Sequence, residues 1–213
     1  MAVIDISRSL TESTAVFPGD RPVALEWTGR QDDGEAVTIS ALHTSVHAGT
    51  HADAPLHFQP HGAPIDALPL SVFVGPAVVL DTPTRDAIRP LHCPPEKIQG
   101  RRRVLFRSPF SKHDGTSWSD DFPHIHPDTA HHLAEHDVVL IGTDAPSVDP
   151  ADSSRLPAHH TLADCGIAIL ENLDLTDAKP GTYWLSAAPL KLVGRDGAPV
   201  RAVLIDTEDS QLH

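Results

Sequence analysis

One histidine-rich stretch, residues 45–57, limits what the chain can fold into more than any other feature. Three histidines and one aspartate fall within eleven residues of it: His47, His51, Asp53 and His57. On a straight strand, at about 3.3 Å per residue, His47 and His51 would stand roughly 13 Å apart, too far to bind one metal ion. Gly49 and Pro55 disfavour a regular helix. The segment must therefore bend, and a bend at Gly49 would let His47, His51 and Asp53 converge.

Imidazole and carboxylate groups together suit zinc, manganese or iron(II). Further ligands are expected from the second half of the chain. His159 is predicted in the first turn of a helix, although His160 is an equal rival on spacing alone. Glu171 follows the apolar run Ile-Ala-Ile-Leu, at the carboxyl end of a predicted strand, where open α/β sheets place their sites. Burying it unpaired would be costly, and a metal would satisfy it. The alternatives are a polar surface loop and a glutamate that turns into solvent.

The remaining pattern is that of a mixed α/β chain with more strand than helix and a few short helices. Strands are predicted over residues 3–7, 37–46, 75–81, 103–107, 138–142, 167–170, 182–185 and 200–205. Helices are predicted over residues 127–135 and 157–165, each with proline at its first position. Gly166 is expected to end the second helix. We expect one domain over residues 1–213.

Composition excludes several classes of function. The formal net charge of −13 argues against nucleic acid and anionic membranes as partners. The N-terminus has no signal-peptide pattern, and the near-apolar run over residues 73–80 is too short to span a membrane. We therefore expect a cytoplasmic protein.

Other catalytic chemistries find little support. The chain has no G-x-S-x-G motif and no glycine-rich phosphate loop. Cys93 and Cys165 are interpreted as structural. The arginine-rich residues 101–107 are interpreted as a solvated turn and strand face rather than an anion site.

The run from His47 to His57, HAGTHADAPLH, resembles the H-x-G-T-H-x-D-x-P-x-H signature of the cyclase-like metal-dependent hydrolases. Further blocks are similar to the bacterial-type kynurenine formamidases (arylformamidases) within that family, and they occur in the same order: FPGD at residues 17–20, GTDAPSVDP at 142–150, LPAH at 156–159 and ILENL at 169–173.

The resemblance implies a swivelling β/β/α fold with a mixed sheet, and a homodimer or larger homo-oligomer. It implies two divalent metal ions, usually zinc, with manganese possible. His47, His51 and Asp53 would hold the first ion, Asp53 and Glu171 would bridge, and His159, rather than His160, would complete the second.

His57 would be the catalytic acid/base of this site. The implied reaction is hydrolysis of N-formyl-L-kynurenine in tryptophan breakdown. Phe17 stands where the formamidases have a tryptophan lining the aryl pocket, while Phe58 is interpreted as core packing in preference to a pocket wall. The alternatives are a hydrolase of a cyclic amide or lactone such as isatin, and a non-catalytic metal-binding module.

Overall fold

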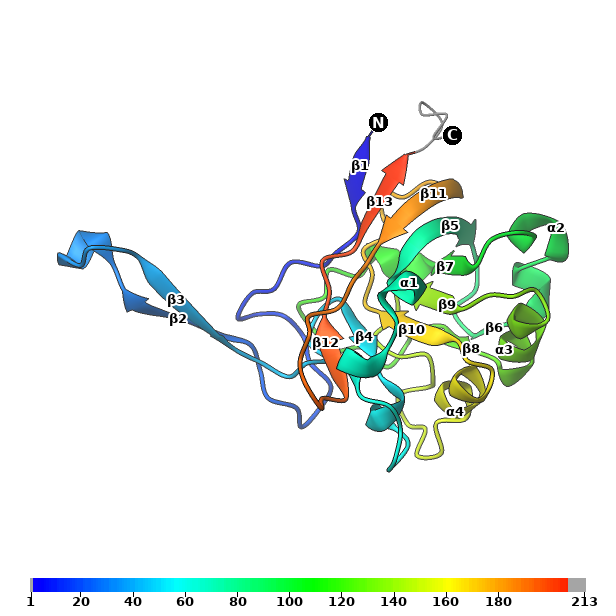
Figure 1. Cartoon of the computed structure of the whole chain (residues 1–213), viewed down its shortest axis with the longest axis horizontal. Coiled ribbons are helices and arrows are strands. Elements are labelled where there is room, and N and C mark those ends of the chain that lie inside the picture. The colour runs from blue at the N-terminus through cyan, green and yellow to red at the C-terminus, as the bar shows by residue number, and fades with distance from the viewer. Residues whose placement is uncertain (1, 207–213) are drawn as a thin grey trace.

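The structure, a computed structural model, describes residues 2–206 (Figure 1). The strands are β1 (Val3–Asp5), β2 (Ala24–Gly29), β3 (Ile39–His43), β4 (His51–Asp53), β5 (Val74–Asp81), β6 (Ala87–Ile88), β7 (Arg103–Arg107), β8 (His124–Ile125), β9 (Leu140–Thr143), β10 (Ala168–Glu171), β11 (Gly181–Ser186), β12 (Gly197–Pro199) and β13 (Val203–Asp206). The α-helices are α1 (Leu70–Phe73), α2 (Pro95–Ile98), α3 (Pro127–Ala134) and α4 (Pro157–Asp164). Within residues 2–206, no helix is long and apolar enough to cross a membrane.

Nine strands form one mixed sheet in the order β1-β13-β11-β5-β7-β9-β10-β4-β12. The four central strands β5, β7, β9 and β10 run parallel, and the flanking strands pair antiparallel. Parallel neighbours require crossover connections, and the chain between β9 and β10 supplies one of them with α4. The predicted mixed sheet with few short helices is confirmed.

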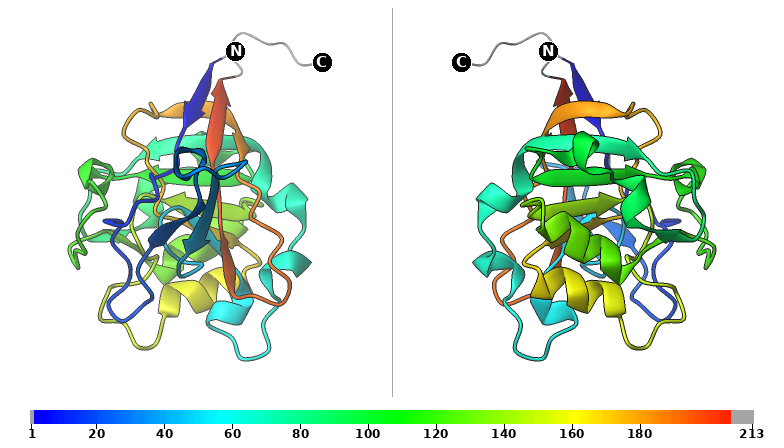
Figure 2. Two further views of the ribbon diagram at one scale, coloured as in Figure 1. Left: turned by 90° about the vertical axis from the view of Figure 1, so that its left-hand side faces the viewer. Right: turned by 90° about the vertical axis from the view of Figure 1, so that its right-hand side faces the viewer.

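Successive side chains of a strand point to opposite faces of the sheet, and each face carries its own apolar core. On one face, Ile141 and Ile169 pack against α3 and α4. On the other face, Leu170 and Ala52 lie in a core that also contains Ala198 of β12 and Leu204 of β13. Since β12 and β13 lie near opposite ends of the sheet, the sheet must curl around this second core (Figure 2).

Strands β2 and β3 form a hairpin that stands away from the body of the molecule as a long arm (Figure 1). Leu25 and Leu42 are paired across it, and both are exposed together with Trp27 and Ile39. An isolated two-stranded hairpin is only marginally stable in water. The sequence prediction covered β3 within residues 37–46 but missed β2.

The predicted strand over residues 200–205 is wrong in its first half and confirmed from Val203 onward. β12 ends at Pro199 and β13 begins at Val203, because the backbone changes partners there. Val200 N donates to Thr50 O, whereas Ala202 O accepts from Ile6 N. The first predicted strand is also shorter than expected and ends at Asp5.

The arginine-rich stretch is a further correction, because Arg103 is buried rather than solvated. Its guanidinium donates to the carbonyls of Ser71, of Val72 at 2.7 Å and of Pro76 at 3.3 Å. A Cβ on Gly75 would come within 2.7 Å of the Arg103 Nη1 atom, so this close approach requires glycine. Arg103 therefore ties α1 to the central sheet.

Candidate active site

The histidine-rich segment bends as predicted. Gly49 has a φ of +65°, which favours glycine, and it closes the turn that carries His47. β4 follows, and Pro55 opens the 3-10 turn Pro55–His57. One short segment therefore supplies side chains from a turn, a strand and a second turn, all beside the same edge of the sheet.

The pairing of β4 with β10 brings the distant glutamate to this segment. Glu171 is directly opposite His51, and Asp53 is opposite Ile169. Directly opposed residues share a face, so His51, Asp53 and Glu171 all point to the side of the sheet covered by α4. His159 lies in the first turn of α4, as predicted, and is buried.

The inner cluster contains Asp53, His159 and Glu171, each only 3% exposed. Their ligand atoms lie within 4.8 Å of one another. His159 Nε2 is 3.4 Å from Asp53 Oδ2 and 3.6 Å from Glu171 Oε1. His160 belongs to none of the ligand clusters found in residues 2–206, and its ring lies against Phe58 instead. Of the two rival histidines, the structure brings His159 to the carboxylates.

A second cluster shares Asp53 and adds His47 and His51. Asp53 Oδ1 is 2.9 Å from His47 Nδ1 and 3.3 Å from His51 Nε2. His51 Nε2 also lies 3.4 Å from Glu171 Oε2. The other four predicted ligands therefore gather around the buried carboxylate of Asp53.

The donor set fits divalent cations. Two clusters of three nitrogen and oxygen ligands that share Asp53 match what zinc or manganese binds. Asp53 Oδ2 is buried and makes no hydrogen bond. An unsatisfied carboxylate oxygen in the interior is costly, and a cation would satisfy it.

Electrostatic coupling at the site is strong. Burial lowers the pKa of His51, but hydrogen bonds and charge from Asp53 and Glu171 outweigh it and raise that pKa to about 10. Burial also lowers the pKa of His159, but Asp149 and Asp53 outweigh this effect and raise that pKa to about 10. Burial raises the pKa of Asp53, yet its close contacts with the rings of His159, His47 and His51 hold it well below its usual value. Strongly shifted pKa values cluster at functional sites.

Two acidic residues that belong to the site were not predicted as such. Asp149 accepts from His159 Nδ1 at 2.7 Å and from the backbone amides of Ala158 and His159. It therefore fixes the ring so that Nε2 faces the inner cluster. The second is Asp196, next to His47 and His57. Asp196 is a lone aspartate in a loop, so the sequence gives no spacing signal for it. Asp149 lies within the GTDAPSVDP block and could have been found from that block.

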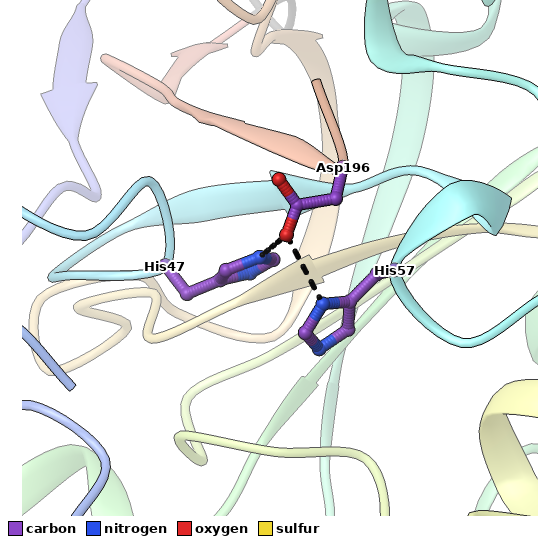
Figure 3. A group of neighbouring side chains, drawn as sticks. All are labelled: His47, His57 and Asp196. Atoms are coloured by element: carbon purple, nitrogen blue, oxygen red, sulfur yellow. Dashed lines mark hydrogen bonds and ion pairs between the residues drawn. The ribbon is translucent and has the colours of Figure 1, made fainter. Parts of the chain in front are cut away.

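His57 lies outside the two ligand clusters that contain Asp53. It is exposed, and its ring centroid is 4.0 Å from that of His47 and 6.2 Å from that of His159. Its Nδ1 lies 3.4 Å from Asp196 Oδ2 (Figure 3). His57 is thus beside the ligand clusters with one side open to solvent.

A cavity of about 480 Å³ opens onto His47, His51, His57 and His159. Phe17, half exposed, lines it together with Trp118, and their ring centroids lie 5.1 Å apart. The sequence analysis did not select Trp118, which comes from a distant loop. Phe58 does not line this cavity and packs against the helix-side core and His159, in line with its predicted core role.

Comparison with known proteins decides the family. Residues 4–150 match the family described as "Putative cyclase". A kynurenine formamidase from Salinibacter ruber is 50% identical over 98% of this chain and 100% of its own length. The chain belongs to this cyclase family. Its fold matches a solved protein described as a potential metal-dependent hydrolase with cyclase activity. The TM-score is 0.82, with 33% identity and coverage of 95% of this chain and 96% of that one.

Another solved structure with a similar fold is isatin hydrolase A from Labrenzia aggregata, bound to benzyl benzoate. It has a TM-score of 0.82, 27% identity and coverage of 97% of this chain and 94% of its own. The predicted resemblance to the cyclase family and its kynurenine formamidases is confirmed.

Proposed function

We propose that this protein is a metal-dependent amidohydrolase that converts N-formyl-L-kynurenine to L-kynurenine and formate. The observation that carries the proposal is the buried carboxylate of Asp53, which two ligand clusters share, with His57 beside these clusters and outside both. The full-length similarity to a kynurenine formamidase supports the choice of substrate.

His47, His51 and Asp53 would hold one divalent ion, and Asp53, His159 and Glu171 a second, with zinc as the preferred metal and manganese as the alternative. When bound, such ions lower the pKa of water to about 7 and polarise a carbonyl oxygen. Glu171 is further fixed by the Val148 amide, which donates to its Oε1 at 2.8 Å. The ligand set is therefore preorganised by backbone and side-chain hydrogen bonds.

His57 would move the proton that the reaction requires. Its ring can accept a proton from the attacking water and donate it to the aniline nitrogen as the bond between that nitrogen and the formyl carbon breaks. General acid–base catalysis of this kind contributes about 10²–10⁴-fold. A histidine used as a metal ligand would lack the free lone pair for this transfer, so the position of His57 outside the shared-carboxylate clusters suits the role.

Phe17 and Trp118 would contact the aryl ring of the substrate. They meet edge to face at the wall of the cavity, 5.1 Å apart between ring centroids. The two rings give the cavity apolar contact area in addition to the imidazoles that also line it.

We further propose that the whole chain forms one cytoplasmic hydrolase domain that assembles as a homodimer or larger homo-oligomer. The exposed apolar residues of the β2–β3 arm, Leu25, Trp27 and Leu42, favour burial against another copy. Size-exclusion chromatography with light scattering tests the assembly.

A spectrophotometric assay of N-formyl-L-kynurenine hydrolysis tests the function. The purified protein should be active, lose activity after chelation, and regain it when zinc or manganese is added back. Isatin, measured in parallel, tests the alternative suggested by similarity to isatin hydrolase A. Bound metal without hydrolysis of any formanilide would instead indicate a non-catalytic metal-binding module.

A further inference from the structure

A carboxylate that has no role in the proposed reaction so far lies between His47 and His57. Asp196 Oδ2 is 2.9 Å from His47 Nε2 and 3.4 Å from His57 Nδ1 (Figure 3). His47 and His57 lie on either side of β4 in sequence, whereas Asp196 comes from the loop that enters β12. One oxygen therefore links a proposed metal ligand to the proposed acid/base.

The backbone holds Asp196 in this place from both sides. Its carbonyl accepts from the Ala54 amide at 2.9 Å, and Gly197 pairs with Asp53 across the β12–β4 ladder. A Cβ on Gly197 would come within 2.8 Å of His47 Cε1 and 2.9 Å of Ala52 O. Glycine after Asp196 thus lets the loop approach the His47 ring closely.

The other two imidazoles of the site are oriented by the same kind of contact. His51 Nδ1 lies 2.9 Å from Gly49 O, and His159 Nδ1 lies 2.7 Å from Asp149 Oδ2, so the Nε2 atom of each faces the carboxylates. An acceptor on one ring nitrogen selects the tautomer and leaves the lone pair on the other. For His47 and His57, Asp196 is placed to be that acceptor.

We propose that Asp196 is a positioning residue that sets the tautomer and orientation of both rings. It accepts the Nδ1 proton of His57, which leaves His57 Nε2 as the atom that exchanges protons with the substrate. It also accepts the Nε2 proton of His47, which leaves Nδ1 facing Asp53. The inference rests on the proposed hydrolase function, and it adds a residue whose carboxylate acts through the two imidazoles.

The test compares Asp196→Ala, Asp196→Asn and Asp196→Glu with Asp66→Ala. Asp66 is the matched control, because its Oδ1 accepts from the Gly194 amide and so tethers the same loop without touching a site histidine. We expect Asp196→Ala to lower kcat for N-formyl-L-kynurenine by about 10- to 100-fold with less than about threefold change in KM, as for other residues that orient functional imidazoles. Asp196→Glu should recover part of kcat and Asp196→Asn less, whereas Asp66→Ala should stay within about twofold of the parent.

A readout independent of turnover is the long-range ¹H–¹⁵N NMR spectrum of the zinc-loaded protein. His57 should carry its proton on Nδ1 in the parent and in Asp66→Ala, and become a mixture of tautomers in Asp196→Ala. If Asp196→Ala matches Asp66→Ala in both kcat and tautomer, the proposal is wrong. If the parent protein does not hydrolyse the substrate, the proposed function fails, while the NMR comparison still decides the role of Asp196.

Discussion

The two sides of the site differ in burial and in access to solvent, which fits the proposed division between metal binding and proton transfer. The inner cluster of Asp53, His159 and Glu171 is buried and held by backbone ladders and helix α4. The outer group of His47, His57 and Asp196 is partly exposed, and two of its members come from turns. Charged groups in a dry, rigid setting suit a bound cation, whereas proton exchange requires access to solvent. The comparison fits the proposed roles of metal binding for the buried cluster and proton transfer for His57, while His47 belongs to the outer group and is also a proposed ligand.

Replacing the exposed histidine gives the largest expected effect on turnover. His57→Ala should lower kcat by about 10²–10⁴-fold and leave the metal content unchanged, because His57 lies outside the shared-carboxylate clusters. Kinetics and elemental analysis of the same sample measure both quantities. His61→Ala, an exposed histidine four residues further on, is the control and should behave as the parent. Loss of metal in His57→Ala would make it a ligand and remove the distinction between the two sides.

On the inner side, Glu171→Gln should reduce metal occupancy. The amide keeps the shape of the side chain and an oxygen for the Val148 amide, but it removes the charge that faces His51 and His159. Metal per chain should fall by about one ion after dialysis, with activity falling alongside. The control variant Glu96→Gln, at an exposed position of α2, should leave the metal content unchanged. Full retention of both ions would exclude Glu171 as a bridging ligand.

The buried imidazoles predict how metal binding depends on pH. The pKa values of His51 and His159 lie near 10, and each must lose its proton before its Nε2 can bind a cation. Affinity should therefore rise about tenfold per pH unit for each displaced proton between pH 7 and 9. Calorimetry in buffers of different ionisation enthalpy would detect the released protons. Binding without proton release would contradict the assignment of these rings as ligands.

The same two histidines determine whether the stability of the chelated protein rises or falls with pH. Their folded-state pKa values are raised above the unfolded value, so protonation favours the folded state. That stabilisation is complete below about pH 6.5 and is lost as the pH rises toward about 10. The Tm of the chelated protein should therefore fall across this window, and added zinc should reverse the trend.

The smallest expected effect lies at the cavity wall. Phe17→Ala should raise KM about fivefold with little change in kcat, since an aromatic pair contributes about 1 kcal/mol of contact. Phe17→Trp should keep KM near that of the parent because the edge-to-face partner Trp118 remains. An unchanged KM in Phe17→Ala would place the aryl ring elsewhere in the cavity.

Much of the site could be anticipated from the chain because its signals are local. The eleven-residue spacing, with glycine at the bend and proline after it, indicated that His47, His51 and Asp53 converge, and Gly49 does take the left-handed conformation. Proline at the first position of α4 and the apolar run before Glu171 correctly placed His159 and Glu171 at the ends of their elements. These features depend on backbone preferences and strand patterning within a few residues.

Contacts between distant segments were decided only by the tertiary structure. The choice of His159 over His160 required α4 to dock on the sheet in one orientation, although the family resemblance had pointed to it. Asp196 and Trp118 reach the site from loops whose sequences carry no pattern, and the buried role of Arg103 depends on the position of α1. The sequence determined which groups could bind a cation, since side-chain chemistry and local bends are written in it. Only the packing of sheet and loops decided which carboxylate orients which imidazole, because those partners lie up to 149 residues apart in the chain.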